Sequence, residues 1–76
     1  MASALVMINV ETGSDYEIQE ALTQISNVKE IFLVYGVYDI VVKIEAESMT
    51  TLREAVISKI RALDQVKATL TMIVYG

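Results

Sequence analysis

The 76-residue sequence contains no cysteine, no histidine, no tryptophan and no proline. Without cysteine the chain has no disulfide, and without cysteine or histidine a structural zinc site is nearly excluded. The commonest catalytic nucleophile and general base are missing too, which weakens any enzymatic interpretation. No cofactor and no metal ion are therefore expected.

Basic residues and long apolar runs are also scarce. The six lysines and arginines are scattered among ten acids, with a net charge of −4, which argues against direct binding of nucleic acid. No apolar run has the length of a membrane span, and no basic-then-apolar leader precedes a cleavage site. The three glycines stand apart, so there is no glycine-rich phosphate loop. These features predict a soluble, cytoplasmic protein.

Apolar residues are what the sequence has in excess, at 54% of the chain. Residues 1–76 are enough for a single domain, which at this size buries only about 60% of the surface that its unfolded chain exposes. Disulfides and metals being absent, oligomerisation is the remaining source of added stability. We therefore expect another copy of the chain to cover part of the apolar surface.

Periodicity and turn signals divide the chain into six elements. Ser14, with Glu17 three residues later, predicts a capping box before the first helix, and Ser48 is a plausible N-cap for the second. Val28 opens the region of the second strand. The expected elements are a strand over 4–10, a helix over about 15–26, strands over 31–35 and 40–44, a helix over about 49–63 and a strand over 68–75.

An internal repeat supports this order. The pattern Ile-x-x-Val-Lys at residues 25–29 recurs as Leu-x-x-Val-Lys at 63–67, and Val-Tyr-Gly at 34–36 recurs at 74–76. Two βαβ halves joined by a hairpin give a ferredoxin-like α+β fold, βαββαβ. Right-handed crossovers place both helices on one face of a four-stranded antiparallel sheet, with the first and third strands central.

The first and the last predicted strands in the sequence are apolar on both faces. Leu5 and Met7 alternate with equally apolar neighbours, and Leu70 and Met72 do the same in the last strand. A sheet covered on one side only would alternate apolar with polar residues, so we expect dimerisation through the second sheet face. Phe32 is expected in the core.

Two groups of polar residues remain as a candidate ligand site. A glycine, hydroxyls and an acid in the hairpin turn, with two threonines on one face of the last strand, offer donors and acceptors for a zwitterion. The simpler alternatives are a capped hairpin, in which Asp39 accepts hydrogen bonds from its own backbone, and ordinary strand threonines. The candidate residues are Tyr35, Gly36, Val37, Tyr38, Asp39, Thr69 and Thr71.

The Gly-x-Tyr-Asp turn at residues 36–39, followed by Val-x-x-Thr-x-Thr at 66–71, resembles the C-terminal effector-binding (RAM) domain of the Lrp/AsnC family. The resemblance covers essentially the whole chain. It implies a βαββαβ fold, dimers formed through the sheets, octamer-like or decamer-like rings, and an amino-acid effector held between dimers. In that family a DNA-binding helix-turn-helix precedes the domain. Here Met1 leads into the first strand within a few residues, so a stand-alone RAM protein is expected.

The same resemblance implies roles for individual residues. Asp39 would bind or orient the α-amino group, the backbone around Gly36 would bind the carboxylate, and Thr69 and Thr71 would form hydrogen bonds nearby. Tyr35 is a weaker candidate. The expected function is a non-enzymatic amino-acid-binding module that modulates Lrp-type regulators, including full-length relatives, by co-assembly. The alternatives are a small enzyme of the dimeric α+β barrel class and an ACT-type regulatory fragment.

Overall fold

Four strands and two helical segments make up the chain in a computed structural model, which describes residues 1–75. The segment of residues 49–61 is continuous and consists of α2, η1 and α3, whereas α1 stands alone. The elements are β1 (Ala2–Val10), α1 (Asp15–Thr23), β2 (Val28–Leu33), β3 (Ile40–Ala46), α2 (Met49–Thr51), η1 (Leu52–Ile57), α3 (Ser58–Arg61) and β4 (Val66–Val74).

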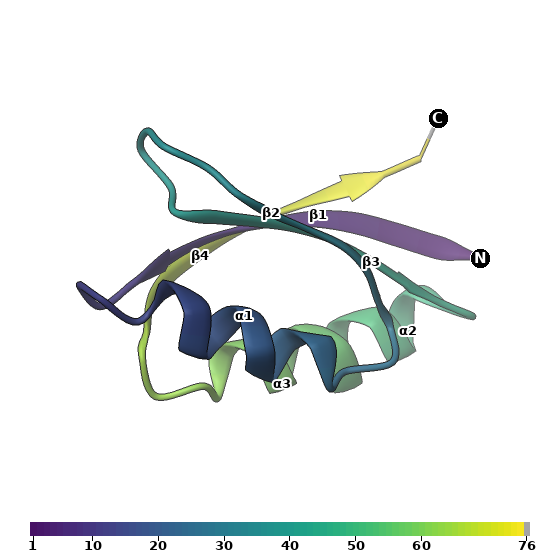
Figure 1. Cartoon of the computed structure of the whole chain (residues 1–76). Helices are drawn as coiled ribbons and strands as arrows, with labels where there is room; N and C mark the ends of the chain where they lie inside the picture. Colours follow the sequence, from purple (N-terminus) through teal and green to yellow (C-terminus); the bar gives the residue numbers. More distant parts are fainter. Residues whose placement is uncertain (76) are drawn as a thin grey trace.

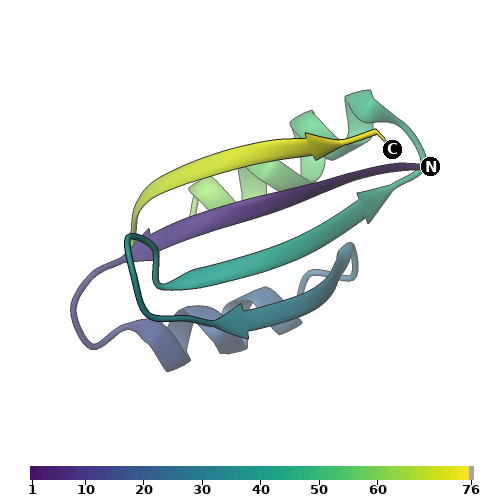
Figure 2. The same cartoon turned by 90° about the horizontal axis from the view of Figure 1, so that it is seen from above.

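The sheet has the order β2-β3-β1-β4, and all its neighbouring strands are antiparallel. Both helical segments lie on one face of the sheet (Figure 1). Seen from above, α1 lies beneath the β2 side and the segment of residues 49–61 beneath the β4 side (Figure 2). The ferredoxin-like α+β prediction is confirmed, including the central position of the first and third strands.

The two predicted N-caps have different outcomes. Ser48 is confirmed as a cap, because its hydroxyl accepts a hydrogen bond from Thr51 N at 3.1 Å. The capping box at Ser14 is wrong, because its side chain makes no capping bond. The backbone of Ser14, with φ −97° and ψ 5°, is not in the extended conformation typical of a cap. Its carbonyl still accepts the first helical bond, from Ile18 N at 2.9 Å.

Both helical segments end two or three residues earlier than predicted, at Thr23 and Arg61. They leave the helix in the same way. Val28 N donates to the Ile25 carbonyl at 3.0 Å, and Val66 N donates to the Leu63 carbonyl at 3.1 Å. The first repeated pattern, at residues 25–29 and 63–67, thus corresponds to two matching helix exits. The second repeated pattern, Val-Tyr-Gly, includes Gly76, which lies outside the described residues. No helix within residues 1–75 is long and apolar enough to cross a membrane.

The core lies between the helices and the sheet. Every second residue of β1 from Ala4 on, and of β3 throughout, is buried there, as the alternation of a strand requires. Among residues 1–75 the buried set is entirely apolar: Ala4, Val6, Ile8, Val10, Ile18, Leu22, Ile40, Val42, Ile44, Ala46, Leu52, Val56, Ile57 and Ile60.

Ile57 is a core residue that the helical spacing of the sequence does not predict. It ends η1, a π-helical stretch in which bonds run from residue i to i+5. Ile57 is buried together with Leu52 and Val56 of the same stretch.

The second sheet face carries a row of apolar residues that nothing within residues 1–75 covers. Phe32, Val41, Met7 and Leu70 are register partners and form a row across all four strands. Phe32 is 49% exposed and Leu70 46%, so the expectation that Phe32 belongs to the core is wrong. Its place in β2 points it away from the helices. The predicted apolar character of both faces is confirmed.

Candidate functional site

The connection between β2 and β3, residues 34–39, rises from the sheet on the side away from the helices (Figure 1). Gly36 has φ +142°, a conformation that side-chain-bearing residues rarely adopt. The side chains of Tyr35 and Val37 are exposed, the latter by 82%, whereas Tyr38 and Asp39 are half-buried. The turn therefore presents aromatic and apolar side chains outward and keeps its acid close to the sheet.

Asp39 is held by three hydrogen bonds to backbone groups. Its Oδ2 accepts from Val10 N at 3.0 Å, its own N donates to the Ile8 carbonyl at 3.0 Å, and its carbonyl accepts from Val34 N at 2.9 Å. The side-chain bond reaches across to the end of β1, 29 residues away in the sequence. The alternative, in which the Asp39 side chain accepts hydrogen bonds from the backbone of its own hairpin, is therefore wrong about the donor, which belongs to β1. Asp39 nevertheless has a structural role.

Thr69 and Thr71 lie on the helix-facing side of β4, where their register partners Ile8 and Val6 are buried. Thr69 Oγ1 accepts a hydrogen bond from Arg61 Nε at 3.3 Å. Thr71 Oγ1 is buried and has no hydrogen-bond partner within residues 1–75. The two threonines share a face, as predicted.

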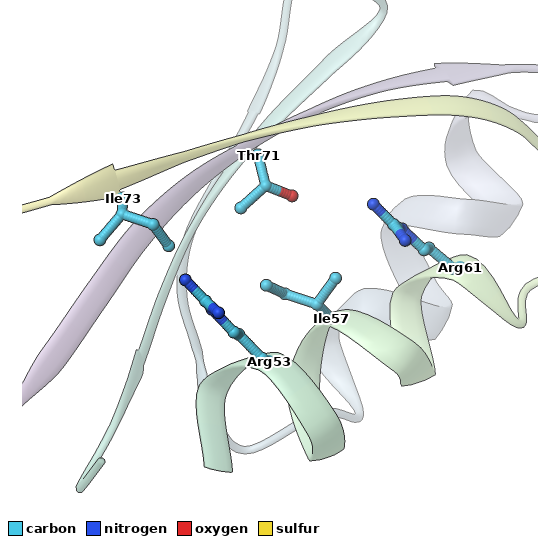
Figure 3. Close-up of a pocket in the computed structure, with 5 residues that line it drawn as sticks. All are labelled: Arg53, Ile57, Arg61, Thr71 and Ile73. Atoms are coloured by element: carbon cyan, nitrogen blue, oxygen red, sulfur yellow. The ribbon is translucent and has the colours of Figure 1, made fainter. Parts of the chain in front are cut away.

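A pocket of about 350 Å³ lies between β4 and the segment of residues 49–61 (Figure 3). The ends of Arg53 and Arg61 and the hydroxyl of Thr71 point into this space. We call it the β4 pocket. Its lining residues are Arg53, Ile57, Arg61, Thr71 and Ile73.

The turn and the threonines are not brought together within one chain. They belong to opposite faces of the sheet, and β1 lies between β3 and β4. Tyr35 lines a separate pocket of about 180 Å³ together with Asp15 and Tyr16 at the start of α1. A small ligand that touches both groups must therefore lie between subunits.

The arginines are the site residues that the sequence interpretation missed. They were counted among scattered basic residues, yet Arg53 and Arg61 are eight positions apart, which is close to two full turns of a helix. That spacing, opposite a strand with threonines two residues apart, is the signal that could have placed them with Thr69 and Thr71.

Three comparisons relate the chain to known proteins. A family model described as the Lrp/AsnC ligand binding domain matches residues 3–76. Homocitrate synthase of Sulfolobus acidocaldarius is 34% identical over 73 residues, which are 92% of this chain. The chain spans only 15% of the length of that enzyme.

Two solved structures are similar over nearly their whole length. The crystal structure of FFRP-DM1 is 33% identical, with a TM-score of 0.94, and the match covers 99% of this chain and 100% of that one. The hypothetical protein PHS023 from Pyrococcus horikoshii is also 33% identical, with a TM-score of 0.92, and the match covers 100% of this chain and 92% of that one.

Proposed function

The chain belongs to the Lrp/AsnC ligand-binding domain family, and we propose that it is an oligomeric amino-acid-binding module with a regulatory, non-enzymatic role. The observation that carries the proposal is the exposed hairpin turn with its anchored acid, on a domain whose family is defined by ligand binding. Residues 1–76 act in this proposal as one functional unit.

The proposed ligand is an amino acid held between dimers. Asp39 Oδ2 is engaged by Val10 N, which leaves the second carboxylate oxygen for an α-ammonium group. Backbone N–H groups around Gly36 bind the α-carboxylate, and Tyr35, Val37 and Tyr38 form the surrounding wall. Thr69 and Thr71 come from a neighbouring subunit, because they lie on the other face of the sheet from the turn.

The proposed assembly begins with a dimer formed through the open sheet face. The row of Phe32, Val41, Met7 and Leu70 supports this, because contiguous apolar surface of this kind marks interaction sites. Dimers then associate into octamer-like or decamer-like rings through the turns. A ligand bound between dimers shifts the equilibrium toward the assembly that binds it better.

The proposed targets are Lrp-type transcription regulators, including full-length relatives, with which the module co-assembles in the cytoplasm. Neither nucleic acid nor membrane is a direct partner in this scheme. The similarity to a segment of homocitrate synthase supports the idea that this domain also occurs within longer proteins of other function.

The test is calorimetry of the intact chain against each of the twenty amino acids, with Asp39→Asn as the variant. Asparagine keeps an acceptor for Val10 N but removes the charge, so binding is expected to fall while the fold and oligomer persist. Glu47→Gln, an exposed acid beyond β3, is the control. Absence of binding at millimolar ligand contradicts the ligand proposal, and a stable folded monomer at micromolar concentration contradicts the assembly.

A further inference from the structure

Both arginines of the chain line the β4 pocket, whereas the four basic residues outside it are lysines. Arg53 belongs to η1 and Arg61 ends α3, and both guanidinium groups point toward the space below β4 (Figure 3). A guanidinium presents a planar fork of donors that matches a carboxylate or phosphate, which a lysine ammonium does not. The choice of arginine at these two positions favours recognition of an oxyanion.

The positive charge of the pocket is not neutralised by the described part of the chain. Within residues 1–75 the ion pair of the structure joins Lys43 to Glu45, at 3.8 Å, on the opposite face of the sheet. Neither arginine therefore has a carboxylate of this region within ion-pair distance. Two like charges directed into one concave space are stabilised by an anion between them.

The Thr71 hydroxyl completes the polar side of the pocket, and the Thr69 hydroxyl contacts one of the two arginines from outside the lining. Thr69 Oγ1 accepts from Arg61 Nε at 3.3 Å and so helps to orient that guanidinium. Thr71 Oγ1 is buried without a partner within residues 1–75, although buried hydroxyls are almost always hydrogen-bonded. An oxyanion in the pocket would accept the hydrogen bond that the Thr71 hydroxyl can donate.

The remaining lining is apolar and limits what the anion can be. Ile57 of η1 and Ile73 of β4 provide hydrocarbon surface beside the arginines. The volume of about 350 Å³ lies at the lower end of the range of small-molecule sites. Inorganic phosphate would leave the apolar wall unused, and a polyanion such as nucleic acid would meet a chain with net charge −4.

We propose that the β4 pocket binds a small aliphatic carboxylate. The carboxylate lies between the two guanidinium groups and the Thr71 hydroxyl, and the hydrocarbon body packs on Ile57 and Ile73. This goes beyond the proposed function, because the pocket is complete in one subunit and requires neither the turn nor an ammonium group on the ligand. Thr71 is common to both proposals, so the arginines carry the test.

The experiment is an NMR titration of the ¹⁵N-labelled chain with 4-methylpentanoate. The chain has two arginines, so two Nε–H signals report on the pocket directly. Both signals are expected to shift with one saturable millimolar curve. Arg53→Gln or Arg61→Gln weakens binding by about fivefold, the upper range for a solvent-exposed ion pair. The double variant, which has no arginine signal and is followed through the backbone amide signals of Thr71 and Ile73, loses saturable binding.

Two controls separate specific recognition from general attraction of anions. Lys59→Gln removes one positive charge from an exposed position of α3 outside the pocket and is expected to leave binding unchanged. The neutral analogue 4-methylpentanamide is expected not to bind. The proposal is overturned by an absence of saturable shifts, by equal binding of the amide, by an equal loss in Lys59→Gln, or by tighter binding of phosphate or an oligonucleotide.

The outcomes also separate this proposal from the amino-acid site. Carboxylate binding in Asp39→Asn supports the β4 pocket even if no amino acid binds to the chain. Amino-acid binding that survives in the double arginine variant supports the turn site, and the absence of any response of the unsubstituted chain to 4-methylpentanoate overturns the β4 pocket.

Discussion

The hairpin turn and the β4 pocket use their polar groups in opposite ways. In the turn, Asp39 forms three hydrogen bonds to the backbone of its own fold. In the β4 pocket, Thr71 Oγ1 is buried without a partner within residues 1–75, and two arginines line the pocket without a carboxylate of that region within ion-pair distance. The acid of the turn thus has a structural role within its own chain, whereas the polar groups of the β4 pocket remain without protein partners in the described residues.

The largest loss of folding stability is expected from Asp39→Ala, which tests the structural role of the turn. The substitution leaves Val10 N without its acceptor and should lower the free energy of unfolding by about 2 kcal/mol, as for a hydrogen bond to a charged group. Asp39→Asn keeps an acceptor and should cost less than about 1 kcal/mol. Urea denaturation of both variants measures the difference. Equal stability of the two would remove the structural role assigned to Asp39.

A smaller loss is expected from Gly36→Ala. An added Cβ would meet no atom within 4 Å, so the cost comes from the backbone at φ +142° and should be about 1 kcal/mol. Gly13→Ala is the matched control, because Gly13 has φ +84° and equally open surroundings but lies outside the turn. Both variants should lose stability in thermal unfolding, and only Gly36→Ala should weaken amino-acid binding. A fully stable Gly36→Ala variant would contradict the conformational requirement.

The smallest effect, and of the opposite sign, is expected from Thr71→Val. Valine has nearly the same shape and removes a buried hydroxyl that has no partner within residues 1–75, so stability should stay unchanged or rise by up to about 1 kcal/mol. Thr69→Val, which loses only an exposed bond to Arg61, should stay within about 0.5 kcal/mol. Urea denaturation curves of both variants measure the change in the free energy of unfolding. A clear loss of stability in Thr71→Val would mean that the Thr71 hydroxyl, like Asp39, has a structural role.

The fold was largely predictable because its signals are local. Ile18 and Leu22 in α1, and Leu52 and Ile60 in the segment of residues 49–61, recur at helical spacing and are buried as that spacing indicates. The errors arose where tertiary structure overrides local pattern. Phe32 lies on the face of β2 away from the helices, and it is exposed because no part of residues 1–75 covers that face.

The candidate site was less predictable, because its residues meet only in three dimensions. The motif from Gly36 to Asp39 was visible in the sequence, but the bond from Asp39 to Val10 spans 29 residues and leaves no local trace. Whether Arg53, Arg61 and Thr71 line one pocket depends on how the segment of residues 49–61 lies against β4. The spacing of basic residues in the sequence does not show which of them line the same pocket in the folded chain.

The alternation of β4 has a consequence for both surfaces at once. Thr69, Thr71 and Ile73 face the helices, whereas Leu70, Met72 and Val74 face the open side. A slip of one residue in the pairing with β1 would exchange the two sets completely. The register between β4 and β1 therefore determines the pocket lining and the proposed partner surface at the same time. An insertion of one residue within β4 would disrupt both.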